Sequence, residues 1–204
     1  MADTTFFHSK GDGPEPGVKR LLLHCCCGPC AVYTVNRLRE EGFDVTGHWY
    51  NPNIHPFTEH RSRLEAMADC AGQMDFPLIV DEYNMVDYFR AVAGHEGQRC
   101  GDCFRLRLAR TAGVAREQGF DAFTTTLLIS PYQEHETLKQ VGEEVAREHG
   151  VVFHYEDFRP GFREGHRLSR EMKLYHQKYC GCVYSEWERY GKVDIGKLLG
   201  EGSG

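Results

Sequence analysis

The sequence predicts an α/β fold in which helices flank a mainly parallel sheet, followed by a helical C-terminal part. Short apolar or β-branched runs alternate along the chain with longer segments of helical periodicity, the pattern of β-α-β units. Glycines such as Gly42 and Gly119 stand directly before two of these runs, where helix C-caps are expected. With 204 residues the chain is long enough for one domain with a sizeable core.

Each element follows from its local pattern. Continuous apolar or β-branched runs predict strands at residues 18–24, 43–50, 76–83, 120–128 and 151–157. Apolar positions at helical spacing predict helices at residues 30–42, 57–72, 84–93, 101–118 and 134–149. The residues after 157 read as helical and polar.

We expect one catalytic domain at residues 17–195, between a disordered segment at 1–16 and a flexible tail at 196–204. The first segment holds acids, glycines and prolines, and lacks the apolar core of a signal peptide. No run has the ~20 apolar residues that span a bilayer, so we expect no membrane partner and a cytoplasmic protein. The net charge of −6 excludes a global basic field for nucleic acid.

The nine cysteines are the most informative residues. An odd count with three adjacent thiols fits a disulfide scaffold poorly, and cytoplasmic thiols stay reduced, so metal binding or catalysis is expected. The segment "HCCCGPC" at 24–30 ends the first long strand, where parallel sheets bind ligands. It holds thiols in the place of a phosphate-binding glycine loop, and GxGxxG and GxxxxGK[ST] are both absent.

Cys100 and Cys103 form a C-x-x-C at the start of a predicted helix, whose N-terminus should lower their pKa and favour the metal-binding thiolate. Together with the thiols at 25–30 they indicate a metal site. Adjacent cysteines crowd one tetrahedral zinc but can bind different irons of a [4Fe–4S] cluster. The pattern therefore favours iron–sulfur over zinc, with zinc left open.

The remaining cysteines differ in role. Strand alternation turns Cys25 toward the core, away from Cys26, and Cys70 reads as a small buried hydrophobe in an amphipathic helix. Cys180-Gly-Cys182 is either a strained, readily reduced redox pair or two more metal thiolates.

Three loop residues are candidates for substrate contact. Asn53 and His55 lie in "YNPNIHP" (50–56), which otherwise reads as a rigid turn. Tyr132 is placed to stack on a base, in a segment where Ser130 is expected to cap the next helix with Pro131 and Gln133 in its first turn.

Basic residues gather at 159–178, interleaved with aromatics, and at 104–116. This composition suits RNA, whose backbone pairs with cations and whose unpaired bases stack on aromatics, and it also suits a solvated helix face.

Taken together, six motifs resemble the cobalamin-independent epoxyqueuosine reductases, the QueH family: "LLLHCCCGPC", "YNPNIHP..E", "RCGDCFRLRLARTA", "FTTTLLISPYQ", "FRPGFREG" and "YCGC.YSE". The resemblance runs from about residue 19 to 189. It implies a cytoplasmic oxidoreductase with a Rossmann-like fold similar to the adenine nucleotide alpha-hydrolases. The implied reaction is the two-electron deoxygenation of epoxyqueuosine to queuosine in the tRNA anticodon loop, in the last step of queuosine formation.

The resemblance also implies residue roles. Cys26, Cys27, Cys100 and Cys103 match the ligands of a [4Fe–4S] cluster, and Cys30 falls where it would help to hold an additional mononuclear iron. Cys180 and Cys182 match a terminal pair with a redox role, while Cys25 fills a position that the family pattern leaves open. The electron donor is not identified. Two other readings remain: a zinc-stapled RNA-binding module, and a thiol–disulfide or sulfur-transfer enzyme.

Overall fold

The sheet has six strands, five of them parallel. The structure, a computed structural model, describes residues 5–7 and 19–192. The strand order is β1-β4-β3-β2-β5-β6, and only β1 runs antiparallel to its neighbour. The strands are β1 (Thr5–Phe7), β2 (Lys19–His24), β3 (Phe43–Trp49), β4 (Leu78–Val80), β5 (Ala122–Thr125) and β6 (Val152–Phe153). The predicted α/β fold with a mainly parallel sheet is confirmed.

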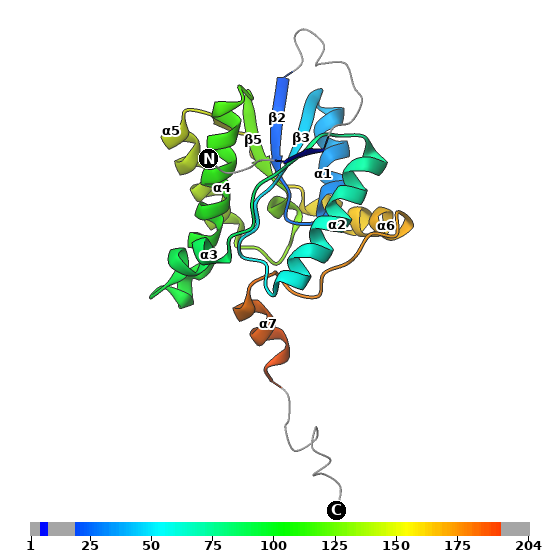
Figure 1. The fold of residues 1–204 in the computed structure, drawn as a ribbon. Coiled ribbons are helices and arrows are strands. Elements are labelled where there is room, and N and C mark those ends of the chain that lie inside the picture. Colours follow the sequence, from blue (N-terminus) through cyan, green and yellow to red (C-terminus); the bar gives the residue numbers. More distant parts are fainter. Residues whose placement is uncertain (1–4, 8–18, 193–204) are drawn as a thin grey trace, which may run out of the picture.

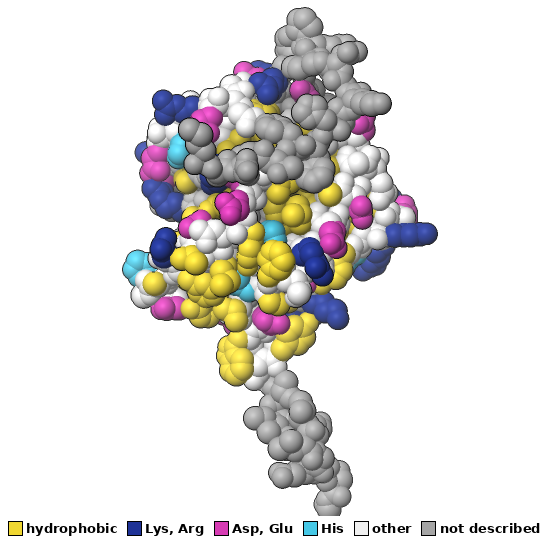
Figure 2. Space-filling model, in the orientation of Figure 1, with side chains coloured by type: hydrophobic (Ala, Val, Ile, Leu, Met, Phe, Trp, Pro, Cys, Tyr) yellow, Lys and Arg dark blue, Asp and Glu magenta, His cyan; other side chains and the backbone are white. Residues whose placement is uncertain are grey.

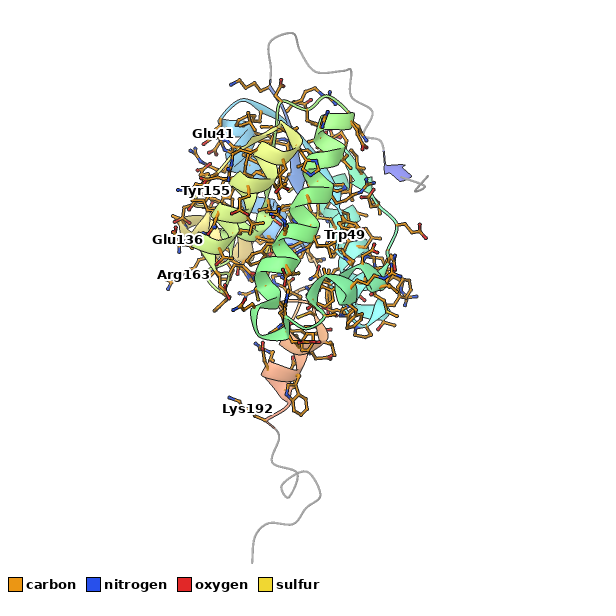
Figure 3. The ribbon with its side chains drawn as sticks, turned by 90° about the vertical axis from the view of Figure 1, so that its left-hand side faces the viewer. Glu41, Trp49, Glu136, Tyr155, Arg163 and Lys192 are labelled. Carbon is orange, nitrogen blue, oxygen red and sulfur yellow. The ribbon has the colours of Figure 1, made fainter. Side chains whose placement is uncertain are left out.

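Helices cover both faces of this sheet (Figure 1). Helices α4 and α5 pack together on one face, while α1 contacts α2 and α6 on the other. The helices are α1 (Gly28–Glu40), α2 (Phe57–Met74), α3 (Met85–Val92), α4 (Arg99–Glu117), α5 (His135–His149), α6 (Phe162–Glu171) and α7 (Val183–Tyr190). Figure 3 shows α4 running along the domain beside α5, with Glu41 near one end of the molecule and Lys192 at the other.

The centre of the sheet is β2, which pairs with β3 on one side and β5 on the other. Leu21, Leu22 and Leu23 are completely buried, because both faces of a parallel strand are covered by helices. After β2 the chain forms β3 and β4 on one side of it, and it then returns to form β5 and β6 on the other side. The strand order therefore switches next to β2, the place where such folds bind ligands.

Three strands are clearly shorter than the sequence suggested. β4 keeps Leu78–Val80 of the expected 76–83. β5 ends at Thr125, whose hydroxyl accepts a hydrogen bond from the Leu127 amide at 3.2 Å and opens a 3₁₀ turn at Thr126–Ile129. β6 keeps two residues of the expected seven at 151–157, since it lies at the sheet edge and Val152 is exposed. Gly42 and Gly119 have φ of 84° and 70°, which confirms their roles at the ends of helices.

The helix predicted at 134–149 is present as α5, but the expected cap at Ser130 with Pro131 and Gln133 in the first turn is wrong. The helix begins at His135, and the Ser130 hydroxyl instead accepts a hydrogen bond from the Tyr132 amide at 3.3 Å within a turn. Gln133 thus precedes the helix and is free to reach a different part of the molecule.

The N-terminal expectation also needs correction, because Thr5–Phe7 forms β1 and pairs with β4 inside the segment expected to be disordered. The rest of 1–16, and the tail at 196–204, lie outside the described residues. Among the helices that the structure describes, none is long and apolar enough to cross a membrane.

Candidate thiol and metal site

Three cysteines converge where β2 turns into α1. Cys27 is the N-cap of α1 in an extended conformation, and Pro29 occupies the first turn, where it loses no helix hydrogen bond. The turn brings the Sγ atoms of Cys26, Cys27 and Cys30 within 4.8 Å of one another. The Cys26 and Cys27 sulfurs are 3.8 Å apart. This group of thiols lies at the carboxyl end of the central strand, as the sequence indicated.

Cys26 is the thiol of this group that ionises most readily. The neighbouring thiols of Cys27 and Cys30, together with the Thr126 hydroxyl, lower its pKa well below the ordinary value, although burial opposes this. The Thr126 hydroxyl donates to the Cys26 sulfur at 3.2 Å and accepts from the Cys26 amide at 2.9 Å. The 3₁₀ turn after β5 therefore supports the turn after β2.

Two glutamines bring distant segments to the thiols. Gln177, from the chain between α6 and α7, donates to the Cys27 sulfur at 3.0 Å. Gln133, just before α5, donates to the Cys180 sulfur at 3.7 Å. Neither residue is part of a regular element, so only the tertiary structure brings them here.

The C-x-x-C pair lies in the first turn of α4, as predicted. Cys103 is buried and Cys100 half-buried. Burial raises the pKa of Cys100 and raises that of Cys103 to about 12. The expectation that the helix N-terminus lowers these values was wrong, because desolvation outweighs the helix dipole here. Within the described part of the chain, neither sulfur joins the Cys26, Cys27 and Cys30 group at the 4.8 Å spacing.

Arg107 lies one turn further along α4 and connects the two groups of thiols. Its side chain is 2% exposed, and its Nε donates to the Cys103 carbonyl at 3.1 Å. Burial lowers the pKa of Arg107, but the sulfurs of Cys103, Cys180 and Cys26 lie near enough to raise it when they are ionised. Burial and the nearby Arg107 lower the pKa of His24 to about 3, so this histidine is neutral. Arg107 is thus the positive charge at the centre of the site.

Several other arginines of the two basic segments are paired with carboxylates. Arg105 pairs with Glu144 and Glu148 of α5, and Arg110 pairs with Asp81. At 159–178, Arg159 pairs with Asp157 and Arg167 with Glu171.

The Cys180-Gly-Cys182 segment lies beside α4 as a pair of free thiols. Cys182 is buried against Cys103 and Tyr88 and is the N-cap of α7, its sulfur accepting from the Ser185 amide at 3.4 Å. Burial alone would raise the pKa of Cys182, but Tyr88, Ser185 and Arg99 lower it below the ordinary value. Cys180 is exposed. Burial of its sulfur nevertheless raises the pKa of Cys180. The pair thus combines a surface residue with a raised pKa and a buried thiol with a lowered pKa.

The "YNPNIHP" loop and α2 hold this segment in place. Arg63 of α2, itself 2% exposed, donates to the carbonyls of Cys180 at 2.8 Å and Tyr179 at 3.0 Å. The His55 amide donates to the Gly181 carbonyl at 2.8 Å. Gly181 has a φ of 148°, and a Cβ there would lie 3.1 Å from the Asn53 Nδ2, so a side chain would be strained.

Asn53 and His55 therefore lie beneath the Cys180–Cys182 segment. Both are buried, and the Asn53 Oδ1 and the His55 Nε2 lack a hydrogen-bond partner among the described residues. The His55 ring stacks on Phe89 at 4.8 Å between centroids.

Aromatic side chains are exposed around this end of the molecule. Tyr132 is 83% exposed and contacts Phe162 edge-on. Figure 2 shows further hydrophobic side chains gathered on the lower part of the visible face, over α3, the start of α2 and α7 (Figures 1 and 2). Exposed members from these helices are Phe57, Met85, Val86, Phe89, Val183, Trp187 and Tyr190. An exposed apolar surface of this kind is typical of an interaction surface.

The two cysteines assigned to the core are confirmed there. Cys25 and Cys70 are both 0% exposed, and burial raises the pKa of each, that of Cys70 to about 12. The Cys25 sulfur bonds to the Leu23 carbonyl at 3.3 Å and lies next to Gly47 of β3.

Sequence reasoning missed Arg107, Thr126, Gln133 and Gln177. Arg107 was counted with a basic helix face, although its four-residue spacing from Cys103 places both on one side of a helix. That spacing was the available signal. The others carried none, because they reach the thiols only through the fold.

The parallel sheet with its switch next to β2, and the buried thiols at that point, define a Rossmann-like α/β protein with a thiol site suited to metal or redox chemistry. The family model described as Epoxyqueuosine reductase QueH matches residues 21–188. The chain belongs to this family and is an oxidoreductase, which confirms the resemblance seen in its motifs.

Individual relatives agree with the family match. The chain is 45% identical over 174 residues to the epoxyqueuosine reductase QueH of Dehalococcoides mccartyi, covering 85% of this chain and 96% of that protein. It is 36% identical to the protein of the same name from Thermotoga maritima, with 84% and 93% covered. For the Histophilus somni protein, identity is 33% with 97% and 87% covered.

Proposed function

We propose that this chain reduces epoxyqueuosine to queuosine in the anticodon loop of tRNA, using a [4Fe–4S] cluster. Family membership supports the reaction. The observation that supports the cofactor is the group of Cys26, Cys27 and Cys30, whose sulfurs lie within 4.8 Å of one another. Cys103 and Cys180, from two distant segments, lie near enough to the same buried arginine as Cys26 to influence its pKa.

The residues present fit an iron–sulfur cluster. Thiolates are the ligands that bind iron–sulfur clusters and zinc, and buried thiols exclude the solvent that degrades a cluster. Cys26, Cys27, Cys100 and Cys103 are the proposed ligands. Cys30, within 4.8 Å of Cys26 and Cys27, is the proposed contact to an additional mononuclear iron. When bound, these groups supply single electrons and a Lewis-acidic position.

The protein's own thiols match the electron count. Loss of the epoxide oxygen as water consumes two electrons and two protons, and oxidation of a dithiol to a disulfide releases the same number. Cys180 and Cys182 are two residues apart, and Cys182 has a lowered pKa, as an attacking thiolate requires. A Cys180–Cys182 disulfide formed in each turnover would then need an external reductant, whose identity is open.

Substrate recognition is assigned to both buried and exposed residues. The unpartnered Asn53 Oδ1 and His55 Nε2 are available to polar groups of the modified nucleoside if the Cys180–Cys182 segment shifts. Tyr132 and the exposed aromatics of α3 and α7 offer stacking surfaces to the unpaired bases of the loop.

Tryptophan fluorescence tests the tRNA contact directly. The chain has two tryptophans, of which Trp49 is completely buried and Trp187 is 69% exposed. Base stacking on α7 would quench Trp187, so titration with an unmodified anticodon stem-loop should quench the wild type. The Trp187→Phe variant should show no quenching, and the Trp49→Phe variant should behave as the wild type. Equal quenching in both variants would place the RNA elsewhere.

The cofactor is tested by anaerobic purification, iron and sulfide analysis and an absorption spectrum. We expect a brown protein with about four iron and four sulfide per chain, plus excess iron. Cys100→Ala should lose the cluster and the activity on epoxyqueuosine tRNA. Cys182→Ala should keep the cluster and lose turnover. A colourless protein with stoichiometric zinc would contradict the mechanism and favour the zinc-stapled RNA-binding module. Full activity without any metal would favour the thiol–disulfide enzyme.

A further inference from the structure

Arg107 is a buried arginine whose guanidinium lies 5.9 Å from the centroid of the Phe104 ring and has no carboxylate partner among the described residues. A buried guanidinium normally pairs with a carboxylate, because an unpaired charge in the interior costs several kcal/mol. Arg107 is 2% exposed, and one of its terminal nitrogens, Nη2, has no hydrogen-bond partner among the described residues. The Nε atom is bound to a neutral carbonyl.

Other arginines of α4 do pair with carboxylates. Arg110, three residues after Arg107, binds both carboxylate oxygens of Asp81, at 2.6 and 3.0 Å. Arg105 reaches two glutamates of α5. Of these three arginines, Arg107 is the buried one, and its Nε binds the carbonyl of Cys103 in the C-x-x-C segment. The sulfurs of Cys103, Cys180 and Cys26 lie near enough to influence its charge.

We infer that Arg107 is the counter-ion of the anionic sulfur-ligated cluster, with its unpartnered Nη2 donating to a ligand or bridging sulfur. This inference rests on the proposed cofactor and adds a role for a residue that is not a ligand. Four thiolates bring four negative charges into a buried site, and a fixed guanidinium offsets part of that charge. Reduction adds a further negative charge, so Arg107 stabilises the reduced cluster more than the oxidised one.

The consequence is a shift in reduction potential. Replacing Arg107 with methionine keeps an unbranched, flexible side chain that tolerates burial, while it removes the charge and the guanidinium. The reduced cluster then loses stabilisation, and the midpoint potential becomes more negative. We expect about a tenfold change in the ratio of reduced to oxidised cluster at a fixed potential, which is about 59 mV for a one-electron couple.

The experiment is a redox titration of anaerobically reconstituted protein, followed by electron paramagnetic resonance, for the wild type, Arg107→Met, Arg107→Lys and Arg105→Met. Iron and sulfide contents are measured on the same samples. Arg107→Met should have the more negative potential, and Arg107→Lys, which keeps the charge, should lie between it and the wild type. Arg105→Met changes an arginine of the same helix that faces α5 and should match the wild type.

Loss of iron in the variant also gives a clear answer. If Arg107→Met fails to hold a cluster while Arg107→Lys holds one, a positive charge is needed for assembly and the inference stands. An Arg107→Met protein with a wild-type cluster and wild-type potential would overturn it. So would failure of both variants, because shape rather than charge would then be the requirement. A wild-type protein without iron would instead contradict the proposed cofactor itself and remove the basis for the inference.

Discussion

Cys25 and Cys26 are neighbours in sequence, yet they belong to two different regions of the molecule. Cys25 faces the core with Cys70, where burial raises the pKa of both thiols. Cys26 faces the site, where adjacent thiols and the Thr126 hydroxyl lower its pKa. Cys25 is completely buried and Cys26 is partly exposed, so their exposure differs as well as their hydrogen-bond partners. The difference teaches that hydrogen-bond donors around a buried sulfur decide whether it is an inert hydrophobe or a ligand.

The largest effect should come from removing a thiol on the site side. Cys26→Ala deletes the thiol that ionises most readily, and we expect bound iron to fall from full occupancy to near zero. Iron and sulfide analysis after anaerobic reconstitution measures this. The matched control is Cys25→Ala, one residue away, which should load as the wild type does. Loss of iron in both variants would mean that the two regions are not functionally distinct.

The next largest effect should be a loss of stability on removing the charge of Asp81. Asp81 directly follows β4, and its carboxylate is hydrogen-bonded to His48 of β3 at 3.1 Å and to Arg110 of α4. Burial raises its pKa, but these partners outweigh burial and lower the pKa from 3.8 to about 2. A difference of this size corresponds to about 2 kcal/mol of stability at neutral pH.

The sign of the pH dependence follows from the direction of the shift. Because the folded-state pKa is lower than the unfolded one, the stabilisation is complete above about pH 4 and is lost as the pH falls toward 2. Asp81→Asn should therefore be about 2 kcal/mol less stable than the wild type at pH 7, with a smaller difference at pH 3. Urea unfolding at both pH values measures this, with the exposed Asp69→Asn as control. A difference that does not change with pH would assign the loss to packing instead of charge.

The smallest effect is expected from the core thiols. Cys25→Ala and Cys70→Ala each remove one buried sulfur, about the size of a methyl group, at a cost of about 1 kcal/mol. For a chain of this size the melting temperature should fall by about 2–4 °C. Thermal unfolding measures the loss, and both variants should keep the iron content of the wild type. A melting temperature equal to that of the wild type would show that these thiols are not tightly packed.

Local patterns allowed much of the site to be predicted. The strand before Cys26 and the C-x-x-C at the start of α4 lie where expected, because apolar runs and helix periodicity are properties of neighbouring residues. The inward direction of Cys25 followed from alternation along a strand. The expected pKa of Cys100 and Cys103 was wrong, since desolvation depends on what packs over the helix start and the sequence does not show this.

The sequence by itself determined the order of strands and helices, the family, and which cysteines lie at element ends, because each depends on local spacing. The tertiary structure alone decided that Gln177 reaches Cys27, that Gln133 reaches Cys180, and that Arg107 lacks a carboxylate while Arg110 has one. These contacts join residues from distant segments through loops without periodicity. Their geometry follows from how the helices pack on the sheet, and it is the packing that turns a basic helix residue into the central charge of the site.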